Sequence, residues 1–333
     1  MEKTVKIISV LLAAVLLVSA VPFAVTAANN TSQAVGDYQR EWTLESGTLT
    51  IYGNAYMHDY GVNDDDRPWN TSDVKKIVIE NGVEYIGESV FRKCEKLKEV
   101  VIAATVTEIG DFAFLRCPAL TKINLPDSIT RIGYGCFRYC GSLKNITLPS
   151  NLTEVEGCTF EECSLESIVI PDTVEFIGDW AFSDNQNLTS VTLGKSIRKI
   201  DNNAFSRTGL TEITIPASVT EIGERAFGYE YKGGGYRLVD GYIIYGRSGS
   251  AAEAYANENG ITFISQDPLI GDANLDGVVD VRDVTVIQRH IAEYELLTGE
   301  KLECADVDGD GEVTVADATL LQMYLAEFDV QIV

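Results

Sequence analysis

The sequence is poor in the residues that most active sites and nucleic-acid-binding surfaces use. It has two histidines, His58 and His290, and neither lies in a nucleophile–base context. Lysine and arginine number 26 against 50 aspartates and glutamates, which gives a formal net charge of −24. Such an acidic chain is repelled by phosphate backbones and by anionic lipid, so nucleic acid and membrane surfaces are excluded as good partners. Calcium ions and basic protein surfaces suit this charge better.

Long apolar runs are also scarce, and the only one lies near the start. Ile7–Val21 is about 15 residues long, shorter than the roughly 20 residues that span a bilayer, and two lysines precede it. Val25 and Ala27 then form a plausible cleavage signature. We therefore expect residues 1–27 to be a signal peptide of a secreted protein that has no membrane association after its removal. An uncleaved anchor is the alternative.

A phrase of the form Ile-Gly-x-x-Ala-Phe recurs through the middle of the chain at spacings of 22 or 23 residues. Leucine and alternating apolar residues follow most copies, as in Leu143–Pro149, and this alternation predicts a β-strand that proline ends. A single turn cannot bury its own apolar side, so several stacked turns with capped ends are needed. The repeat therefore predicts a solenoid. Its phenylalanines are Phe91, Phe114, Phe137, Phe160, Phe182, Phe205 and Phe227.

The chain has seven cysteines, an odd number that cannot pair completely. Four of them follow a repeat phenylalanine by three residues, and Asn185 and Thr208 take that place in later turns. Because Cys, Asn and Thr share a small side chain that can satisfy backbone groups, we expect a buried ladder. A disulfide framework is the alternative. Cys136 and Cys158 are expected to fill core space, and the ladder cysteines are Cys94, Cys117, Cys140 and Cys163.

Residues 38–264 resemble the leucine-rich repeats of BspA-like bacterial surface proteins, and the resemblance extends to both ends. Trp42–Tyr52 has the pattern of a hairpin that turns at Ser46 and Gly47. At the other end we expect a strand at Tyr242–Tyr245, a helix opened by a capping box at Ser250–Glu253 and ended by Gly260, and a last strand at Ile261–Ile264. The expected regions are residues 28–73 for the N-terminal part with its β cap and residues 74–265 for the repeats with their C-terminal cap.

The composition becomes strongly acidic after residue 268, with 15 acidic and 3 basic residues to the end. Asp272–Asp283 and Asp306–Asp317, 34 residues apart, match EF-hand loops: oxygen side chains alternate, glycine holds position six, and aspartate replaces the usual final glutamate. A solvated acidic run could explain one match but not two in phase. Each loop leads into a segment of helical periodicity, Val281–Tyr294 and Val315–Phe328, and no helix-forming segment precedes either loop at EF-hand distance.

Two such loop–helix units resemble a type I dockerin, the calcium-dependent module that docks secreted proteins onto cohesins of a cellulosome scaffold. The resemblance covers Gly271–Phe328 and sets the expected dockerin at residues 268–330. It implies two Ca²⁺ ions. The ligands implied for the first are Asp272, Asn274, Asp276, Asp283, the Val278 carbonyl and, through water, Asp280; those for the second are Asp306, Asp308, Asp310, Asp317, the Glu312 carbonyl and Thr314.

The same resemblance implies which residues contact the cohesin. The two copies agree at three of the five positions and differ where Arg282 and Arg289 face Ala316 and Met323. Only about four residues separate the repeats from the dockerin, where the family usually has a Pro/Thr-rich tether, so we expect little movement between them. The implied contacts are Val281, Arg282, Gln288, Arg289 and Glu293 in the first copy, and Val315, Ala316, Gln322, Met323 and Glu327 in the second.

The sequence predicts a β-rich leucine-rich-repeat solenoid with β caps, followed by a small all-α dockerin with two EF-hand-type calcium loops. We expect a secreted, extracellular, cellulosome-associated binding protein, not an enzyme, whose solenoid recognises an unknown protein or glycan. The alternatives are an inhibitor of, or an enzyme acting in, extracellular polysaccharide or protein degradation. Small, nearly uncharged residues are expected on the concave strand face: Val78, Val101, Asn124, Thr147, Val169, Thr192 and Thr214.

Overall fold

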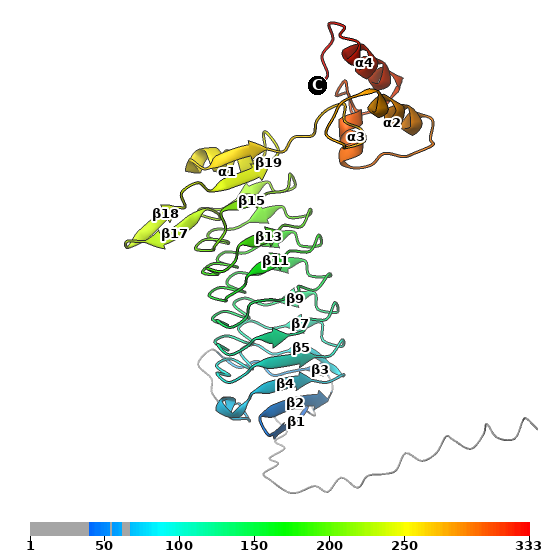
Figure 1. Cartoon of the computed structure of the whole chain (residues 1–333). Coiled ribbons are helices and arrows are strands. Elements are labelled where there is room, and N and C mark those ends of the chain that lie inside the picture. Colours follow the sequence, from blue (N-terminus) through cyan, green and yellow to red (C-terminus); the bar gives the residue numbers. More distant parts are fainter. Residues whose placement is uncertain (1–39, 54, 62–66) are drawn as a thin grey trace, which may run out of the picture.

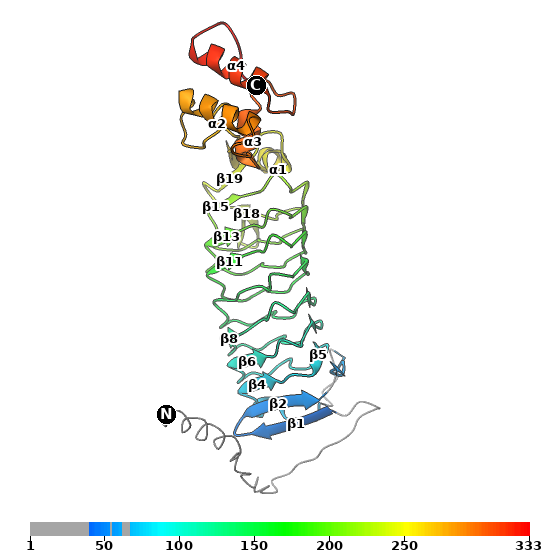
Figure 2. The same ribbon diagram turned by 90° about the vertical axis from the view of Figure 1, so that its right-hand side faces the viewer.

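The computed structural model describes residues 40–53, 55–61 and 67–333. The expected signal peptide, residues 1–27, lies outside the described residues. Figures 1 and 2 show a column of stacked turns followed by a small helical domain. The column is a β-solenoid of about eight turns, so the predicted fold class is confirmed. Among the residues that the structure describes, no helix is long and apolar enough to cross a membrane.

Parallel strands along one side of the solenoid come from the alternating apolar residues of each turn. Ile77 and Val100 are buried and lie opposite one another in register, while Val78 and Val101 face outward. The first strand pairs antiparallel with the second through a turn at Ser46 and Gly47, so the hairpin is confirmed. The strands on this side are β1 (Arg40–Glu45), β2 (Thr48–Gly53), β4 (Lys76–Ile79), β6 (Glu99–Ile102), β8 (Lys122–Ile123), β11 (Ser167–Val169), β13 (Ser190–Thr192) and β15 (Glu212–Thr214).

A second set of parallel strands, which the sequence analysis did not predict, lies just before each phenylalanine. Most of these strands are two residues long and bury one isoleucine or valine, as Ile109 does in β7. They form two four-stranded sheets. The strands are β3 (Ala55–Tyr56), β5 (Val83–Ile86), β7 (Glu108–Ile109), β9 (Arg131–Ile132), β10 (Glu154–Val155), β12 (Phe176–Ile177), β14 (Lys199–Ile200) and β16 (Glu221–Ile222); a short 3₁₀ helix, η1 (Thr71–Asp73), precedes β4.

The repeat phenylalanines form one continuous column of stacked rings through the core. Neighbouring ring centroids lie 5.0 to 5.4 Å apart, and every ring is at most 1% exposed. Trp69 stacks on the first ring at 5.8 Å, and Tyr255 meets the last ring edge-on at 6.3 Å. Both terminal turns are therefore covered by an aromatic side chain from a cap, which closes the apolar ends of the column.

The small-residue column after the phenylalanines is a buried ladder, as predicted. The Cys140 thiol donates to the Phe114 carbonyl of the preceding turn at 3.3 Å, and the Asn185 amide donates to the Phe160 carbonyl of its preceding turn at 2.8 Å. Thr208 instead donates to the Phe205 carbonyl of its own turn at 3.0 Å. All seven cysteines are buried and unpaired, so the alternative of a disulfide framework is wrong in this structure.

The strand predicted within Leu143–Pro149 does not form. In the described chain, no backbone hydrogen bond joins residues 145–147 to either neighbouring turn, so the sheet stops at β8 and starts again at β11. Asn124 explains the break on one side. Its side-chain amide donates to the Ile102 carbonyl and accepts from the Ile102 N–H, both at 2.9 Å, in place of a backbone partner. We call residues 145–148 the sheet gap.

Replacing Asn124 tests this explanation. Asn124→Ala leaves the N–H and C=O of Ile102 without their partners, so we expect the free energy of unfolding to fall by about 1–2 kcal/mol. Thr147→Ala is the matched control in the next turn, because Thr147 is exposed and the cost there should stay within about 0.5 kcal/mol. Urea unfolding of the full chain measures both. Equal losses would contradict the role given to the amide.

The C-terminal cap is the predicted β-α-β unit with two differences. β19 (Ile243–Gly246) and β20 (Thr262–Ser265) continue the sheet beyond β15, and α1 (Ala251–Asn259) ends at Gly260 in the left-handed conformation. The predicted capping box is wrong: the Ser250 hydroxyl makes no cap hydrogen bond, and Glu253 accepts from the Gly249 N–H instead. The structure also adds an unpredicted antiparallel hairpin, formed by β17 (Tyr229–Lys232) and β18 (Gly235–Leu238).

The helical domain contains α2 (Val281–Ile291), α3 (Glu300–Ala305) and α4 (Val315–Leu325). Both long helices end three residues earlier than predicted, because Glu293 and Glu327 take the left-handed conformation at φ 59° and turn the chain away. The prediction that no helix precedes either loop is wrong for the second loop, since α3 ends where that loop begins. Val284, Ile287 and Leu321 join α2 and α4 in a small core.

Candidate calcium centre and partner-binding faces

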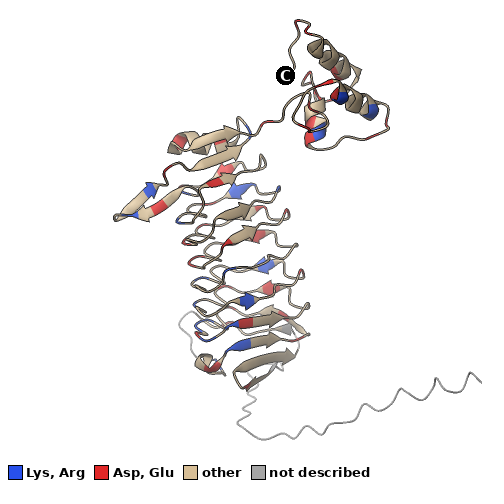
Figure 3. Cartoon of the chain, viewed as in Figure 1, with Lys and Arg blue, Asp and Glu red and all other residues tan. Residues whose placement is uncertain are grey.

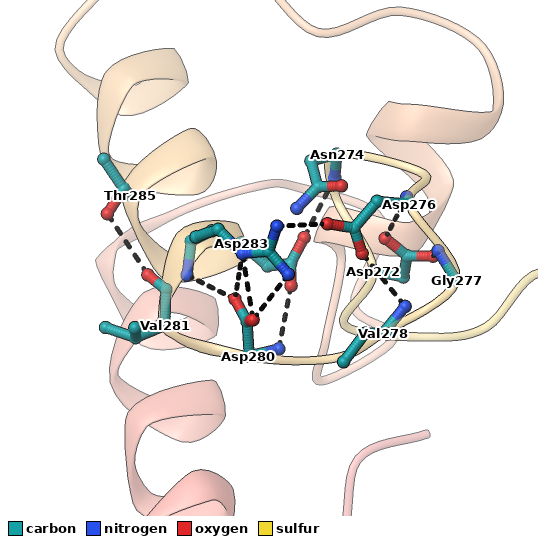
Figure 4. Close-up of polar contacts among 10 residues, drawn as sticks. Asp272, Asn274, Asp276, Gly277, Val278, Asp280, Val281, Asp283 and Thr285 are labelled. Carbon is teal, nitrogen blue, oxygen red and sulfur yellow. Dashed lines mark hydrogen bonds and ion pairs between the residues drawn. The ribbon is translucent and has the colours of Figure 1, made fainter.

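Backbone N–H groups of the first acidic loop donate hydrogen bonds to carboxylates of the same loop. The Asp272 carboxylate accepts from the N–H groups of Asp276 at 3.1 Å and Gly277 at 2.8 Å, and Asp283 accepts from Asn274 at 3.0 Å and Asp280 at 2.9 Å. Asp272 and Asp283 are 3% and 0% exposed. Figure 4 shows these side chains gathered within one loop. Two buried carboxylates therefore lie in a site whose backbone donors orient them.

The second loop repeats this arrangement. Asp306 accepts from the N–H of Asp310 at 3.1 Å and Gly311 at 2.9 Å, and buried Asp317 accepts from Asp308 at 3.2 Å. Oxygens of Asp306, Asp308 and Asp317 all lie within 4.8 Å of one another. Loss of hydration, followed by repulsion from the neighbouring carboxylates, raises the pKa of Asp308. Crowded negative oxygens of this kind favour a bound cation.

The donor set fits calcium. The side chains implied as ligands offer carboxylate, amide or hydroxyl oxygen, which suits a hard cation that takes six to eight oxygens. Gly277 and Gly311 have φ of 83° and 92°, a conformation that side chains rarely adopt, so position six needs glycine. The residues expected to offer backbone carbonyls, Val278 and Glu312, directly follow these glycines and are exposed.

The ninth residue of each loop also caps the helix that follows. Asp280 accepts from the Arg282 N–H at 2.7 Å, and the Thr314 hydroxyl accepts from the Ala316 N–H at 3.1 Å. The twelfth residue closes the capping box in both copies. The start of each helix and the shape of each loop therefore depend on the same side chains, and loss of the loop would remove the helix N-cap.

The residues that the sequence assigned to cohesin contact lie on the helices α2 and α4, except Glu293 and Glu327, which lie two residues beyond the helix ends. Val281 and Val315 are 70% and 65% exposed, unusual values for large apolar side chains at the starts of helices. Arg282, Gln288, Arg289 and Glu293 are exposed in the first copy, and Ala316, Gln322 and Glu327 in the second, while Met323 is half-buried. The cohesin-contact residues of both copies are therefore mostly accessible to a partner, although Arg282 also forms ion pairs with carboxylates of the first loop.

The solenoid and the helical domain meet through a short connection. The Gln266 N–H donates to the Gly246 carbonyl at 2.7 Å, and Asp267 accepts from the Ser248 N–H at 2.7 Å, so the chain stays bound to the cap until Asp267. Arg247 of the cap also forms an ion pair with Glu303 of α3, with a nitrogen–oxygen distance of 3.2 Å. An exposed pair of this kind contributes at most about 1 kcal/mol. The expectation of little movement between the parts stays a prediction.

A hollow on the outward strand face lies over the sheet gap. It has a volume of about 650 Å³ and contains no charged residue in its lining. The Ile146 side chain, which lines the cavity, is only partly buried, whereas Ile77 and Val100 at the equivalent position of earlier turns are fully buried. Val169 at its edge is 64% exposed. Of the outward column that the sequence analysis named, the residues that line this cavity are Asn124, Thr147 and Val169.

Family models match both parts of the chain. The BspA type leucine-rich repeat region matches in six copies over residues 68–188 and 153–232, and the dockerin type I domain matches residues 270–326. The chain is a BspA-type leucine-rich repeat protein with a C-terminal type I dockerin domain. Both domains are of non-catalytic types. No curated protein matches this chain.

Solved structures similar to this leucine-rich repeat protein come from several bacteria. A leucine rich cell surface protein from Faecalibacterium prausnitzii is 22% identical, covers 72% of this chain and 73% of its own, and gives a TM-score of 0.38. The T. pallidum leucine rich repeat protein is 21% identical, covers 70% of this chain and 98% of its own, and gives a TM-score of 0.41. A leucine-rich repeat protein from Bacteroides ovatus is 22% identical, covers 70% of this chain and 67% of its own, and gives a TM-score of 0.37.

The two histidines, which the sequence analysis did not count as candidate catalytic residues, lie elsewhere in this leucine-rich repeat protein. His290 accepts from the Leu297 N–H at 3.0 Å and so fixes the chain after α2, and His58 is exposed beside Tyr60. The sequence analysis missed the cavity over the sheet gap. The signal that could have found it is Asn124, the one amide in a column of β-branched residues.

Proposed function

We propose that this protein is a secreted, non-catalytic binding protein that attaches to a scaffold through its dockerin. Two calcium ions bind the two acidic loops and hold α2 and α4 in place. The exposed residues of these helices then bind a cohesin module, and the solenoid binds a protein or glycan near the same extracellular assembly. The observation that carries the proposal is the repeated loop: two copies, 34 residues apart, with a buried carboxylate at position twelve and the same backbone donors in both.

The exposed valines support a protein partner for the helical domain. Val281 and Val315 begin the two helices, and burying an exposed side chain of this size contributes about 1.5–3 kcal/mol. Gln288 and Gln322 stand seven residues further on, two helical turns away and on the same face. Each copy therefore presents an apolar anchor beside polar groups, which is the pattern of a binding surface.

The cavity over the sheet gap supports ligand binding by the solenoid. Figure 3 shows charged residues scattered along the column. At the strand starts, opposite charges form ion pairs, as between the Lys76 nitrogen and a Glu99 carboxylate oxygen at 3.0 Å. The cavity itself offers amides, hydroxyls and apolar side chains without charge. An uncharged polar ligand fits this lining better than a charged one.

Calcium-dependent cohesin binding tests the proposed anchoring. The full chain should bind an immobilised type I cohesin with calcium and lose binding with a chelator. Asp276→Ala together with Asp310→Ala should abolish binding, whereas Asp329→Ala, an exposed acidic residue after α4, should leave it unchanged. Binding that persists in the double variant would contradict the proposal.

We expect one preferred orientation on the cohesin. Arg282 and Arg289 give the first copy two cations where the second copy has Ala316 and Met323, so a cohesin that presents carboxylates gains only from the first. Arg282→Ala with Arg289→Ala should weaken binding about tenfold or more, because each charged hydrogen bond contributes about 1.5–3 kcal/mol at best. Surface plasmon resonance measures the affinity.

The second copy provides the control for this prediction. Ala316→Glu with Met323→Glu should leave the affinity within about threefold if the first copy alone makes contact. If each double variant still binds and only the combined variant fails, the two orientations are interchangeable and the prediction is wrong.

A further inference from the structure

The two loops are matched closely enough for one to serve as a control for the other. Among the side chains implied as ligands, each loop has four carboxylates; the second loop also carries the Glu312 side chain, and the pattern of backbone donors is the same in both. Asp276 corresponds to Asp310, and Asp280 corresponds to Thr314. With equal numbers of charged ligands, the two loops should attract calcium about equally unless another group distinguishes them.

Arg282 distinguishes them. One guanidinium nitrogen lies 2.8 Å from a carboxylate oxygen of Asp276, and a second lies 2.7 Å from Asp280. Its Nε also donates to both oxygens of Asp280, at 2.9 and 3.1 Å. Figure 4 labels Asp276 and Asp280, the two carboxylates of the first loop that the guanidinium contacts. The corresponding residue of the second loop is Ala316, which can make no such contact.

The contact uses an oxygen that the first loop needs. Asp276 is one of the implied ligands, and its carboxylate cannot be oriented by the guanidinium and by an ion in the same way. The positive charge beside the loop also opposes the approach of a cation. In the second loop, by contrast, Asp306, Asp308 and Asp317 already stand within 4.8 Å of one another with no cation beside them.

We propose that Arg282 competes with calcium at the first loop, so that the second loop fills first and the first fills only when Asp276 exchanges the guanidinium for the ion. The inference rests on the proposed calcium binding of both loops. It also gives Arg282 two states: bound to the first loop at low calcium, and released from Asp276 when that loop is filled. Because its side chain is 61% exposed, the ion pair is weak and the competition amounts to about fivefold in affinity.

Calcium titration of the full chain with isotope-labelled glycine tests the order of filling. The amides of Gly277 and Gly311 report the two loops separately by NMR. In the unaltered protein, the Gly311 signal should shift at about fivefold lower calcium than the Gly277 signal. A Gly277 signal that shifts first, or together with Gly311, would overturn the inference. If neither glycine responds to calcium, the proposed calcium binding itself fails.

Variants of one residue identify the cause. Arg282→Ala should raise the affinity of the first loop about fivefold, and Arg282→Gln, which keeps the side-chain length, should do the same if the alanine variant folds poorly. Arg289→Ala is the matched control, since Arg289 lies on the same helix and pairs only loosely with Glu295 at 3.9 Å. The reciprocal change, Thr314→Asp with Ala316→Arg, should weaken the second loop. An unchanged order of filling in both Arg282 variants would contradict the role of the guanidinium.

Discussion

Removing calcium is expected to unfold residues 268–333 and to leave the solenoid standing. The dockerin core consists of eight buried residues, three of them alanine, and a core this small rarely stabilises a domain without a metal or disulfide. Fifteen acidic residues repel one another in the same segment. Each filled loop adds about 4 kcal/mol when calcium exceeds its dissociation constant a thousandfold. Without the ions, the buried side chains of Asp283 and Asp317 lack the cation partner that the loops are proposed to bind.

Circular dichroism of the full chain measures this result. Chelator should remove most of the helical signal, because α2 and α4 begin at the loops and share their capping side chains with them. The β signal should remain, since the solenoid core has no contact with the loops' ligands. Asp276→Ala should damage the first loop and spare the second. Identical spectra with and without chelator would show that the helices do not depend on calcium.

The repeat predicted the phase of the solenoid because the spacing of a buried ring is a strong physical constraint. A phenylalanine every 22 or 23 residues can stack only if each turn has the same path, and the rings indeed lie about one turn apart at 5.4 Å. The ladder of Cys140 and Asn185 was predictable for a related reason, since unlike residues at one buried position must share a function. Both inferences depended on columns of residues rather than on single ones.

Features that depend on one side chain were missed or misplaced. Asn124 interrupts the sheet because its amide replaces a backbone partner, an exchange that alternation of apolar residues cannot reveal. The helix ends at Glu293 and Glu327 were placed too late because glutamate rarely adopts the left-handed conformation that ends a helix there. The two-residue strands before each phenylalanine are too short to show a period of their own. For the acidic loops, the sequence named the residues that are proposed as ligands, but not the contact of Arg282 with Asp276.

The largest expected effect in the solenoid comes from truncating a ring in the middle of the phenylalanine column. Phe160 is 0% exposed and stacks on Phe137 and Phe182 with centroids 5.4 Å away on both sides. Phe160→Ala therefore removes contacts in three turns at once and leaves a cavity that the stacked backbone cannot close. We expect a loss of about 3–5 kcal/mol in the free energy of unfolding.

Lys98→Ala provides the control, because Lys98 is exposed immediately before β6 and its loss should cost under about 0.5 kcal/mol. Thermal unfolding in saturating calcium separates the two variants: about 2–4 °C per kcal/mol for a domain of this size predicts a shift of roughly 10 °C for the phenylalanine and about 1 °C for the lysine. Because each turn of a solenoid is stabilised by its neighbours, the break at Phe160 should also expose the turns on both sides to proteolysis before global unfolding. Equal shifts for the two variants would show that the ring column does not carry the stability of the stack, and cleavage spread evenly along the chain would show that the turns do not depend on their neighbours.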